Sequence, residues 1–318
     1  MSTDLNETPD VAAVTAEGRT AAPRRSGTWR YLRRDPAFVV GTLFLALVVM
    51  AALLAPVLAP FDPNTQVLEN RLLPPRWMEG GSAEHLLGTD NLGRDVFSRL
   101  LHGGRVSLLI ATIVTVIAGG VGILLGLIVG YRRGWSERVV MGWIDLQLSF
   151  PVILMIILII TVVGPSILTL VVCISLTHWL IYTRTTRSSV LSVSQAPYVA
   201  AAEVAGGSTW RVLRRHVLPN LISPLLTLAL LEFASVILVE AALSFLGLGI
   251  QPPYTSWGLD VSIGKEYIFN AWWLVSFPGL AITLTVLALN FVSSSMRSAL
   301  DPTVRATRLL AQEGGGGV

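Results

Sequence analysis

Two glutamates, Glu232 and Glu240, lie inside a long apolar run of the sequence. A charge is costly inside a membrane, so a carboxylate in such a run indicates a polar cavity or a partner by default. The two positions are just over two helical turns apart and lie on roughly neighbouring faces. Either glutamate can serve as a proton or cation site or contact a transport pathway, and Glu240 can also reach headgroup water near the end of the run.

The other reactive residue types form no recognisable site. The single cysteine, Cys173, lies in an apolar block and is interpreted as a packing residue, and His178, beside Trp179, as an interfacial residue. Metal-spaced Cys/His sets, H-E-x-x-H and G-x-S-x-G are absent, and the stretch Gly258–Glu266 has the wrong spacing for a phosphate loop. The sequence therefore predicts no catalytic residue, no bound metal and no directly bound cofactor, and it does not favour an enzyme.

The composition indicates that lipid is the main solvent of this chain. Hydrophobic residues make up 53% and charged residues 14%, with a mean hydropathy of +0.65, whereas soluble domains contain about 25% charged residues. Because a bilayer core needs about 20 apolar residues in a helix, we predict an all-α integral membrane protein with six transmembrane helices. The expected spans lie near residues 38–58, 106–129, 144–163, 167–182, 221–246 and 272–292.

The positive charges predict the orientation of these spans. With the amino terminus inside, seventeen arginines fall in inner segments and six basic residues in outer ones, and Lys and Arg accumulate on the cytoplasmic side. We therefore expect both termini in the cytoplasm, with residues 1–30 as a disordered tail, 31–302 as the six-span domain and 303–318 as a second tail. Gly122, Gly126 and Gly130 recur every four residues in the second span, which favours close helix packing.

The inner loop at residues 183–220 has the features of a docking element. Pro197 can start a short helix and the glycine pair Gly206 and Gly207 can end it. Ser208 can cap a second helix, and Pro219 is expected to break it before the next span. Two short helices with exposed alanines suit insertion into a groove of another protein. An amphipathic helix held by anionic lipid is the alternative.

This loop resembles the signature of permease subunits of bacterial ATP-binding-cassette importers. That pattern has a Glu-Ala-Ala triplet, a glycine four residues later and often His-x-x-Pro-Asn in the peptide branch. Ala200 stands where the glutamate would be, so the alanines, the glycine bend and the arginines must carry any ATPase contact. The coupling residues that the resemblance implies are Tyr198, Ala200, Ala201, Ala202, Gly206, Gly207, Arg211, Arg214, Arg215, His216, Pro219 and Asn220.

Three further stretches resemble the second permease of the dipeptide, oligopeptide and nickel branch. They are residues 85–108, 240–258 and 297–302, so the resemblance covers the chain from about residue 30 to 302. Serines at 293–295 replace the more usual glycine and acidic residue. The resemblance implies an outer gate or a docking surface for a binding protein at Gly88, Thr89, Asp90, Gly93, Arg94, Asp95, Pro252, Pro253 and Trp257.

The same resemblance implies a type I importer fold in the bacterial inner membrane. The expected partners are a second homologous permease, two ATP-binding-cassette ATPases that hold ATP and Mg, an extracytoplasmic binding protein and lipid, with no nucleic acid. Di- or oligopeptides are the first choice of substrate, followed by nickel chelates, glutathione or glycans. A proton-coupled secondary transporter that uses Glu232 and a structural membrane scaffold are the alternatives of other classes.

Overall fold

The structure is a computed structural model that describes residues 32–300. Within this range the chain is almost entirely helical and forms no strand, only an isolated bridge between Thr89 and Asp95. The predicted tails at 1–30 and 303–318, and the end of the 297–302 stretch, lie outside the described residues. The helices are α3 (Pro36–Leu53), α4 (Ala55–Leu58), α5 (Val96–Tyr131), α6 (Trp135–Leu148), α7 (Val152–Val163), α8 (Ile167–Val193), α9 (Pro197–Val204), α10 (Thr209–Val212), α11 (Leu218–Phe245), α12 (Trp257–Gly264) and α13 (Trp273–Leu300).

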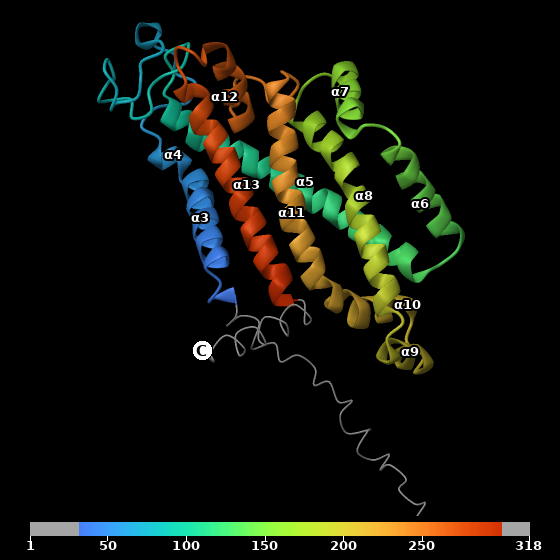
Figure 1. Ribbon diagram of the computed structural model, residues 1–318. Helices are drawn as coiled ribbons and strands as arrows, with labels where there is room; N and C mark the ends of the chain where they lie inside the picture. The colour runs from blue at the N-terminus through green and yellow to red at the C-terminus, as the bar shows by residue number, and fades with distance from the viewer. Residues whose placement is uncertain (1–31, 301–318) are drawn as a thin grey trace, which may run out of the picture.

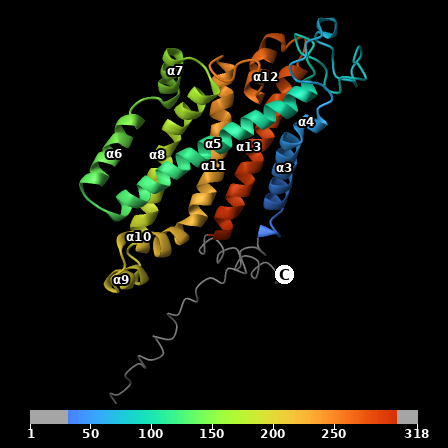
Figure 2. The same cartoon turned by 180° about the vertical axis from the view of Figure 1, so that it is seen from behind.

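Five of these helical segments are long and apolar enough to cross a membrane. They are α3, α5, α8, the continuous segment Thr209–Phe245 and α13, and the bent pair α6–α7 makes a sixth if it is one span. The predicted all-α membrane fold is thus confirmed in the part of the chain that the structure describes. Four of the spanning helices, α3, α13, α11 and α8, stand side by side, and α5 crosses behind them (Figure 1). The view from behind shows α5 crossing α13, α11 and α8 (Figure 2).

Helix α5 begins at Val96 instead of near residue 106, because Asp95 caps it. The Oδ2 atom of Asp95 accepts hydrogen bonds from the backbone N–H and the hydroxyl of Ser98, each at 2.8 Å. Helix α8 continues to Val193, beyond the expected end near residue 182, since no helix breaker occurs before Pro197. His178 therefore lies in the middle of a long helix, where it is buried within the protein, and not near the helix end that the interfacial interpretation assumes.

The continuous helix into the fifth span also differs from the expectation. Pro219 does not break the chain, because a π-helical turn at Leu213–Val217 joins α10 to α11. The N–H of Leu218 bonds to the carbonyl of Leu213, five residues back, and this wider turn accommodates the N–H that Pro219 lacks. Helix α10 and the fifth span, α11, are therefore one continuous helical segment.

The third span is broken at Ser149–Pro151, and its two halves are bent by 84°. Pro151 supplies no N–H and disfavours helical geometry at Phe150. A cavity of about 600 Å³ with almost entirely apolar lining lies between α6 and the helices α5 and α8, whereas Ile156 and Ile160 of α7 pack into the core with α8. Three polar contacts connect α6 to α8 across this gap: the ion pairs Glu137–Arg187 and Asp145–Arg184, and the hydrogen bond from Gln147 to the Leu176 carbonyl.

The glycines of the second span allow α5 to pack closely on α8, as the sequence predicts. A Cβ atom added at Gly122 would lie 2.5 Å from Tyr182 Cβ, and one at Gly126 would lie 2.5 Å from Thr186 Cβ. Neither distance is possible without movement of α8. The stripe is therefore a packing device that fixes the central helix against its main partner.

We predict that Gly126→Leu destabilises the protein by about 1–3 kcal/mol through overpacking. Gly120→Leu is the matched control, because a Cβ atom at Gly120 meets no atom within 4 Å. The measurement is the midpoint of thermal unfolding in detergent, followed by size-exclusion chromatography. Equal midpoints for the two variants would contradict this account of the α5–α8 contact.

Candidate functional site

The loop segment, residues 197–220, lies at one end of the molecule, opposite α12 (Figure 1). Helix α9 ends at Val204, and Gly206, two residues later, has a φ of +80°, in the region that favours glycine. The N–H of Gly207 then bonds to the carbonyl of Ala202 at 3.1 Å, while Ser208 makes no side-chain cap bond. The glycine pair thus closes α9 and redirects the chain into α10.

One side of α9 packs against the protein and the other side is free. Val199 and Ala202 contact an apolar cluster that includes Leu127 of α5, Val190 of α8 and Leu221 of α11. Ala200 and Ala201 are exposed. The prediction of exposed alanines is therefore correct for Ala200 and Ala201, but Ala202 is half-buried because it faces this cluster.

The exposed face of the segment carries large apolar side chains that the sequence analysis missed. Val204 is 90% exposed and Trp210 is 56% exposed. With Tyr198 they border the two exposed alanines, so this face is apolar and unpartnered within the described residues. The signal in the sequence is that α9 is apolar on both sides, which a helix seated on one face does not require.

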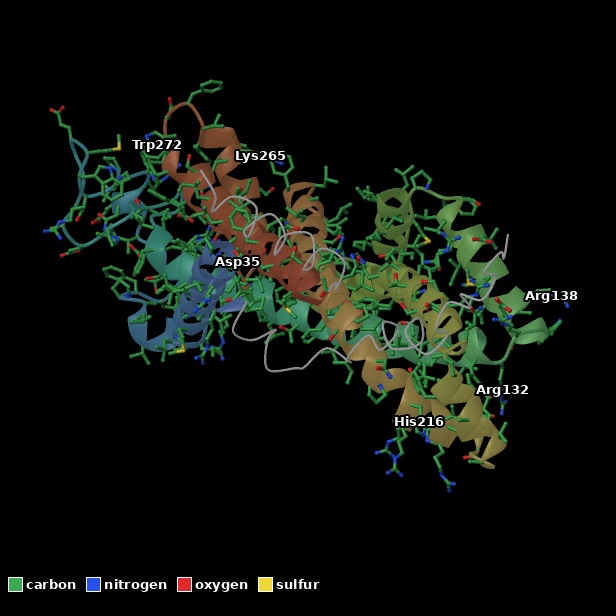
Figure 3. All side chains as sticks on the ribbon, turned by 60° about the horizontal axis from the view of Figure 1, so that its bottom comes forward. Asp35, Arg132, Arg138, His216, Lys265 and Trp272 are labelled. Atoms are coloured by element: carbon green, nitrogen blue, oxygen red, sulfur yellow. The ribbon has the colours of Figure 1, made fainter. Side chains whose placement is uncertain are left out.

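The predicted cationic residues lie beside this face. Arg211, Arg214 and Arg215 are exposed, and with Ser208 and Trp210 they line an open hollow of about 440 Å³. Figure 3 shows His216 at the same end of the molecule as Arg132, the residue that follows α5. The arrangement presents positive charge around a shallow apolar surface, which suits an acidic groove or an anionic membrane surface.

Hydrogen bonds connect the loop segment to two long helices. The Tyr131 hydroxyl, at the end of α5, donates to the carboxylate of Glu203. Asn220 Nδ2 in α11 donates to the Tyr198 hydroxyl at 3.2 Å. Glu203 lies one turn after Ala200, so the loop has a carboxylate near the usual position, but this carboxylate binds Tyr131. The sequence analysis missed both Tyr131 and Glu203.

The structure gives the two carboxylates of α11 different surroundings. Glu240 is 1% exposed and accepts hydrogen bonds from three hydroxyls, those of Ser107, Ser244 and Ser256. It therefore does not reach headgroup water. The side chain of Glu232 is 16% exposed, and its nearest charged neighbour is His178, with Nε2 at 3.8 Å from Oε2.

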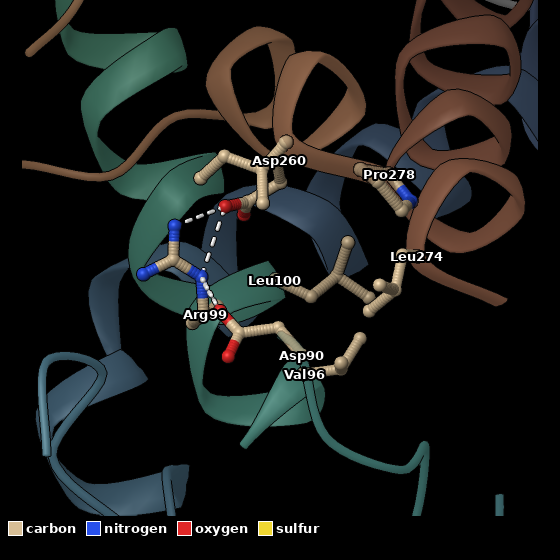
Figure 4. A pocket seen from close by; sticks show the side chains of 8 residues that line it. Asp90, Val96, Arg99, Leu100, Asp260, Leu274 and Pro278 are labelled. Carbon is tan, nitrogen blue, oxygen red and sulfur yellow. Dashed lines mark hydrogen bonds and ion pairs between the residues drawn. The ribbon is translucent and has the colours of Figure 1, made fainter. Parts of the chain in front are cut away.

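Most residues predicted for an outer gate are buried and hold the cap segment, residues 59–95, onto the helices. Asp90 accepts from Arg94 Nε at 2.6 Å, and Arg99 of α5 joins Asp90 to Asp260 of α12 (Figure 4). Trp257 Nε1 donates to the Leu100 carbonyl at 2.9 Å. The sequence analysis missed Arg99 and Asp260. The buried members are Gly88, Thr89, Asp90, Gly93, Arg94, Asp95 and Trp257, whereas Pro252 and Pro253 are exposed.

Two family models match the chain. Residues 122–306 match the inner membrane component of binding-protein-dependent transport systems, and residues 25–75 match the N-terminal transmembrane domain of oligopeptide transport permease C. The first match contains the whole loop segment and covers more than half of the chain. The chain belongs to the binding-protein-dependent transport permease family. The resemblance seen in the sequence is thereby confirmed.

Characterised members of this family align with most of the chain. The di/tripeptide transport system permease protein DppC of Pseudomonas aeruginosa is 43% identical over 277 residues, which cover 87% of this chain and 91% of that protein. The dipeptide transport system permease protein DppC of Escherichia coli K12 is 41% identical over 87% of this chain and 92% of that protein. The DppC protein of Haemophilus influenzae is 35% identical, with 87% and 94% covered. The family consists of transport permeases, and this chain is a multi-pass membrane protein of a bacterial transport system.

Proposed function

We propose that this chain is the second permease of an ATP-driven importer of di- or tripeptides. It forms the translocation pathway with a homologous permease, receives peptide from an extracytoplasmic binding protein and is driven by two cytoplasmic ATPases that hold ATP and Mg. The relatives that support the peptide assignment are dipeptide and di/tripeptide permeases. Nickel chelates, glutathione and glycans are the alternative substrates of the same machinery.

The observation that carries the ATPase contact is the unpartnered apolar face of α9 and Trp210. A face with Val204 at 90% exposure, beside three exposed arginines, fits a groove in a separate protein. Nine of the predicted coupling residues lie on α9, in the glycine pair or among the arginines. Seven of them are exposed on or beside this face, and Ala202 and Gly207 are half-buried. The loop is then cytoplasmic, which is the side that the arginine distribution predicts for it and for both termini.

The contacts of the loop segment suggest how a movement of the ATPases reaches the spans. A displacement of α9 acts on α5 through Glu203 and Tyr131, and on α11 through Tyr198 and Asn220. The π-helical turn joins α10 to α11 without a hinge. Because α5 and α11 both belong to the core of the bundle, the ATPases can reorient the pathway from inward to outward facing.

Fewer of the predicted gate residues can contact a binding protein directly than the sequence suggests. Pro252 and Pro253 are exposed and form the part of the predicted surface that a binding protein can touch directly. The buried cap residues act by fixing the cap to the helices: Asp95 joins His85 to Ser98 of α5, and the Thr89 carbonyl accepts from Trp273 Nε1 of α13. We propose that this assembly moves as one unit when the binding protein docks.

The experiment that tests the proposed function is co-purification of the complex followed by peptide uptake in proteoliposomes. We expect both ATPases and the binding protein to accompany the chain, a peptide to be found in the binding protein by mass spectrometry, and uptake to require ATP. A nickel chelate in the binding protein would overturn the peptide assignment. Uptake driven by a proton gradient without ATPases would instead favour a secondary transporter that uses Glu232, and the absence of any uptake would favour a scaffold.

A further inference from the structure

The spanning helices that the structure describes contain four acidic side chains, and three of them have complete partners. Glu137 pairs with Arg187 and Asp145 pairs with Arg184, both between α6 and α8. Glu240 accepts from three serine hydroxyls. Glu232, in the middle of α11, has no arginine or lysine partner in the described chain, and only His178 approaches it. An intramembrane carboxylate without a cation is a binding site by default.

The hydrogen bonds of His178 indicate which ring nitrogen carries the proton when the imidazole is neutral. A neutral imidazole does not supply the positive charge that Glu232 lacks. Its Nδ1 atom lies 3.0 Å from the carbonyl oxygen of Ile174, and a carbonyl only accepts, so this nitrogen carries the proton. The Nε2 atom of the neutral ring is then an acceptor. It faces Glu232 Oε2 at 3.8 Å and Ser235 Oγ at 3.5 Å.

Two free acceptor atoms therefore lie near the His178 ring between α8 and α11: Glu232 Oε2 and Ser235 Oγ, whose hydroxyl donates to His178 Nε2 and whose oxygen can still accept. One positive charge with several N–H donors would complete this set, and an ammonium group has three N–H donors. Glu232 is partly exposed, so the set can be reached from outside the helix pair.

We propose that Glu232, His178 and Ser235 bind the amino-terminal ammonium group of a peptide in transit. This inference rests on the proposed peptide import and names the residues of this chain that contact the substrate. The carboxylate supplies the opposite charge and the Ser235 oxygen supplies a second acceptor, while His178 Nε2 holds the Ser235 hydroxyl in place. His178 and Glu232 lie near the middle of their spanning helices, where a charged group needs polar partners.

The test uses the purified complex, with both permeases, ATPases and binding protein, in proteoliposomes. It compares peptide uptake and ATP hydrolysis for Glu232→Gln, Glu232→Asp and the control Glu69→Gln, which neutralises an exposed carboxylate outside the spans. We expect Glu232→Gln to lower uptake per ATP hydrolysed about tenfold. A change of this size corresponds to the loss of one charge-assisted hydrogen bond. Glu232→Asp should restore part of the uptake, and Glu69→Gln should match the parent.

The outcomes separate this inference from the proposed function. Failure of the parent complex to take up peptide refutes the proposed function itself. If the parent transports and Glu232→Gln transports equally well per ATP, the ammonium site is refuted. If Glu232→Gln releases the second permease during purification, the missing cation belongs to that subunit, and the ammonium site is also refuted. Lower uptake per ATP with all subunits present supports it.

Discussion

Ala201→Arg is expected to abolish ATP-dependent uptake and co-purification of the ATPases, while the subunit remains folded in the membrane. Ala201 is exposed at the centre of the unpartnered face of α9, so the added side chain costs nothing within this chain. In the complex it would place a charge and a long side chain in an apolar contact. Disrupting such a central contact costs about 2–4 kcal/mol, roughly a 30- to 1,000-fold loss of affinity.

The measurement is the amount of ATPase retained on the tagged permease, together with uptake in proteoliposomes. Ser136→Arg is the matched control, because Ser136 is exposed in the first turn of α6 and not on this face. A substitution at Ala202 would be a poorer test, since Ala202 packs in the cluster with Leu127. Normal ATPase retention by Ala201→Arg would refute docking through α9.

Arg99→Met is expected to destabilise the folded protein by about 3–5 kcal/mol. The guanidinium of Arg99 pairs with Asp260 and approaches Asp90, and all three side chains are nearly inaccessible to solvent. Removing the cation leaves a buried carboxylate without its partner, which costs much more than losing a surface ion pair. The measurement is denaturant unfolding in detergent micelles.

The pH dependence of this loss distinguishes electrostatics from lost packing. Burial raises the pKa of Asp260, and the neighbouring Arg99 guanidinium opposes that rise. Without Arg99, the folded state holds a proton on Asp260 at pH values where the unfolded state has released it. Stability of the variant therefore falls as pH rises above the ordinary range of an aspartate and recovers below it. The double variant Arg99→Met, Asp260→Asn should recover much of the loss at neutral pH, and a pH-independent deficit would contradict the ion-pair account.

Much of the fold follows from the sequence because lipid imposes simple constraints. Runs of apolar residues must become helices, and the glycine spacing in α5 identifies the face that α8 covers. The effects of helix-capping and helix-breaking residues on the helix boundaries were harder to predict. Asp95 extends α5 backwards, and a π-helical turn cancels the expected effect of Pro219. Such local hydrogen bonds outweigh the residue preferences from which the boundaries were inferred.

The candidate site was predictable where it depends on local chain geometry, and missed where it depends on distant pairing. The α9 helix, its glycine end and the exposed arginines follow from adjacent residues. The partners of Glu240, by contrast, come from positions as far apart as Ser107 and Ser256. Tyr131 and Glu203 are separated by 72 positions. No periodic pattern connects residues across such separations, so only the assembled bundle reveals these contacts.

The pairing of Arg99 with Asp260 also constrains how the protein is made. The two residues are 161 positions apart in the chain, and a ribosome adds about 5–20 residues per second. The arginine therefore exists for roughly 10–30 s before its aspartate has been synthesised. During that interval the cap has only Asp90 to neutralise Arg99. Nascent chains that stop before residue 260 should consequently expose the cap to proteases, and protection should appear only once α12 has been synthesised.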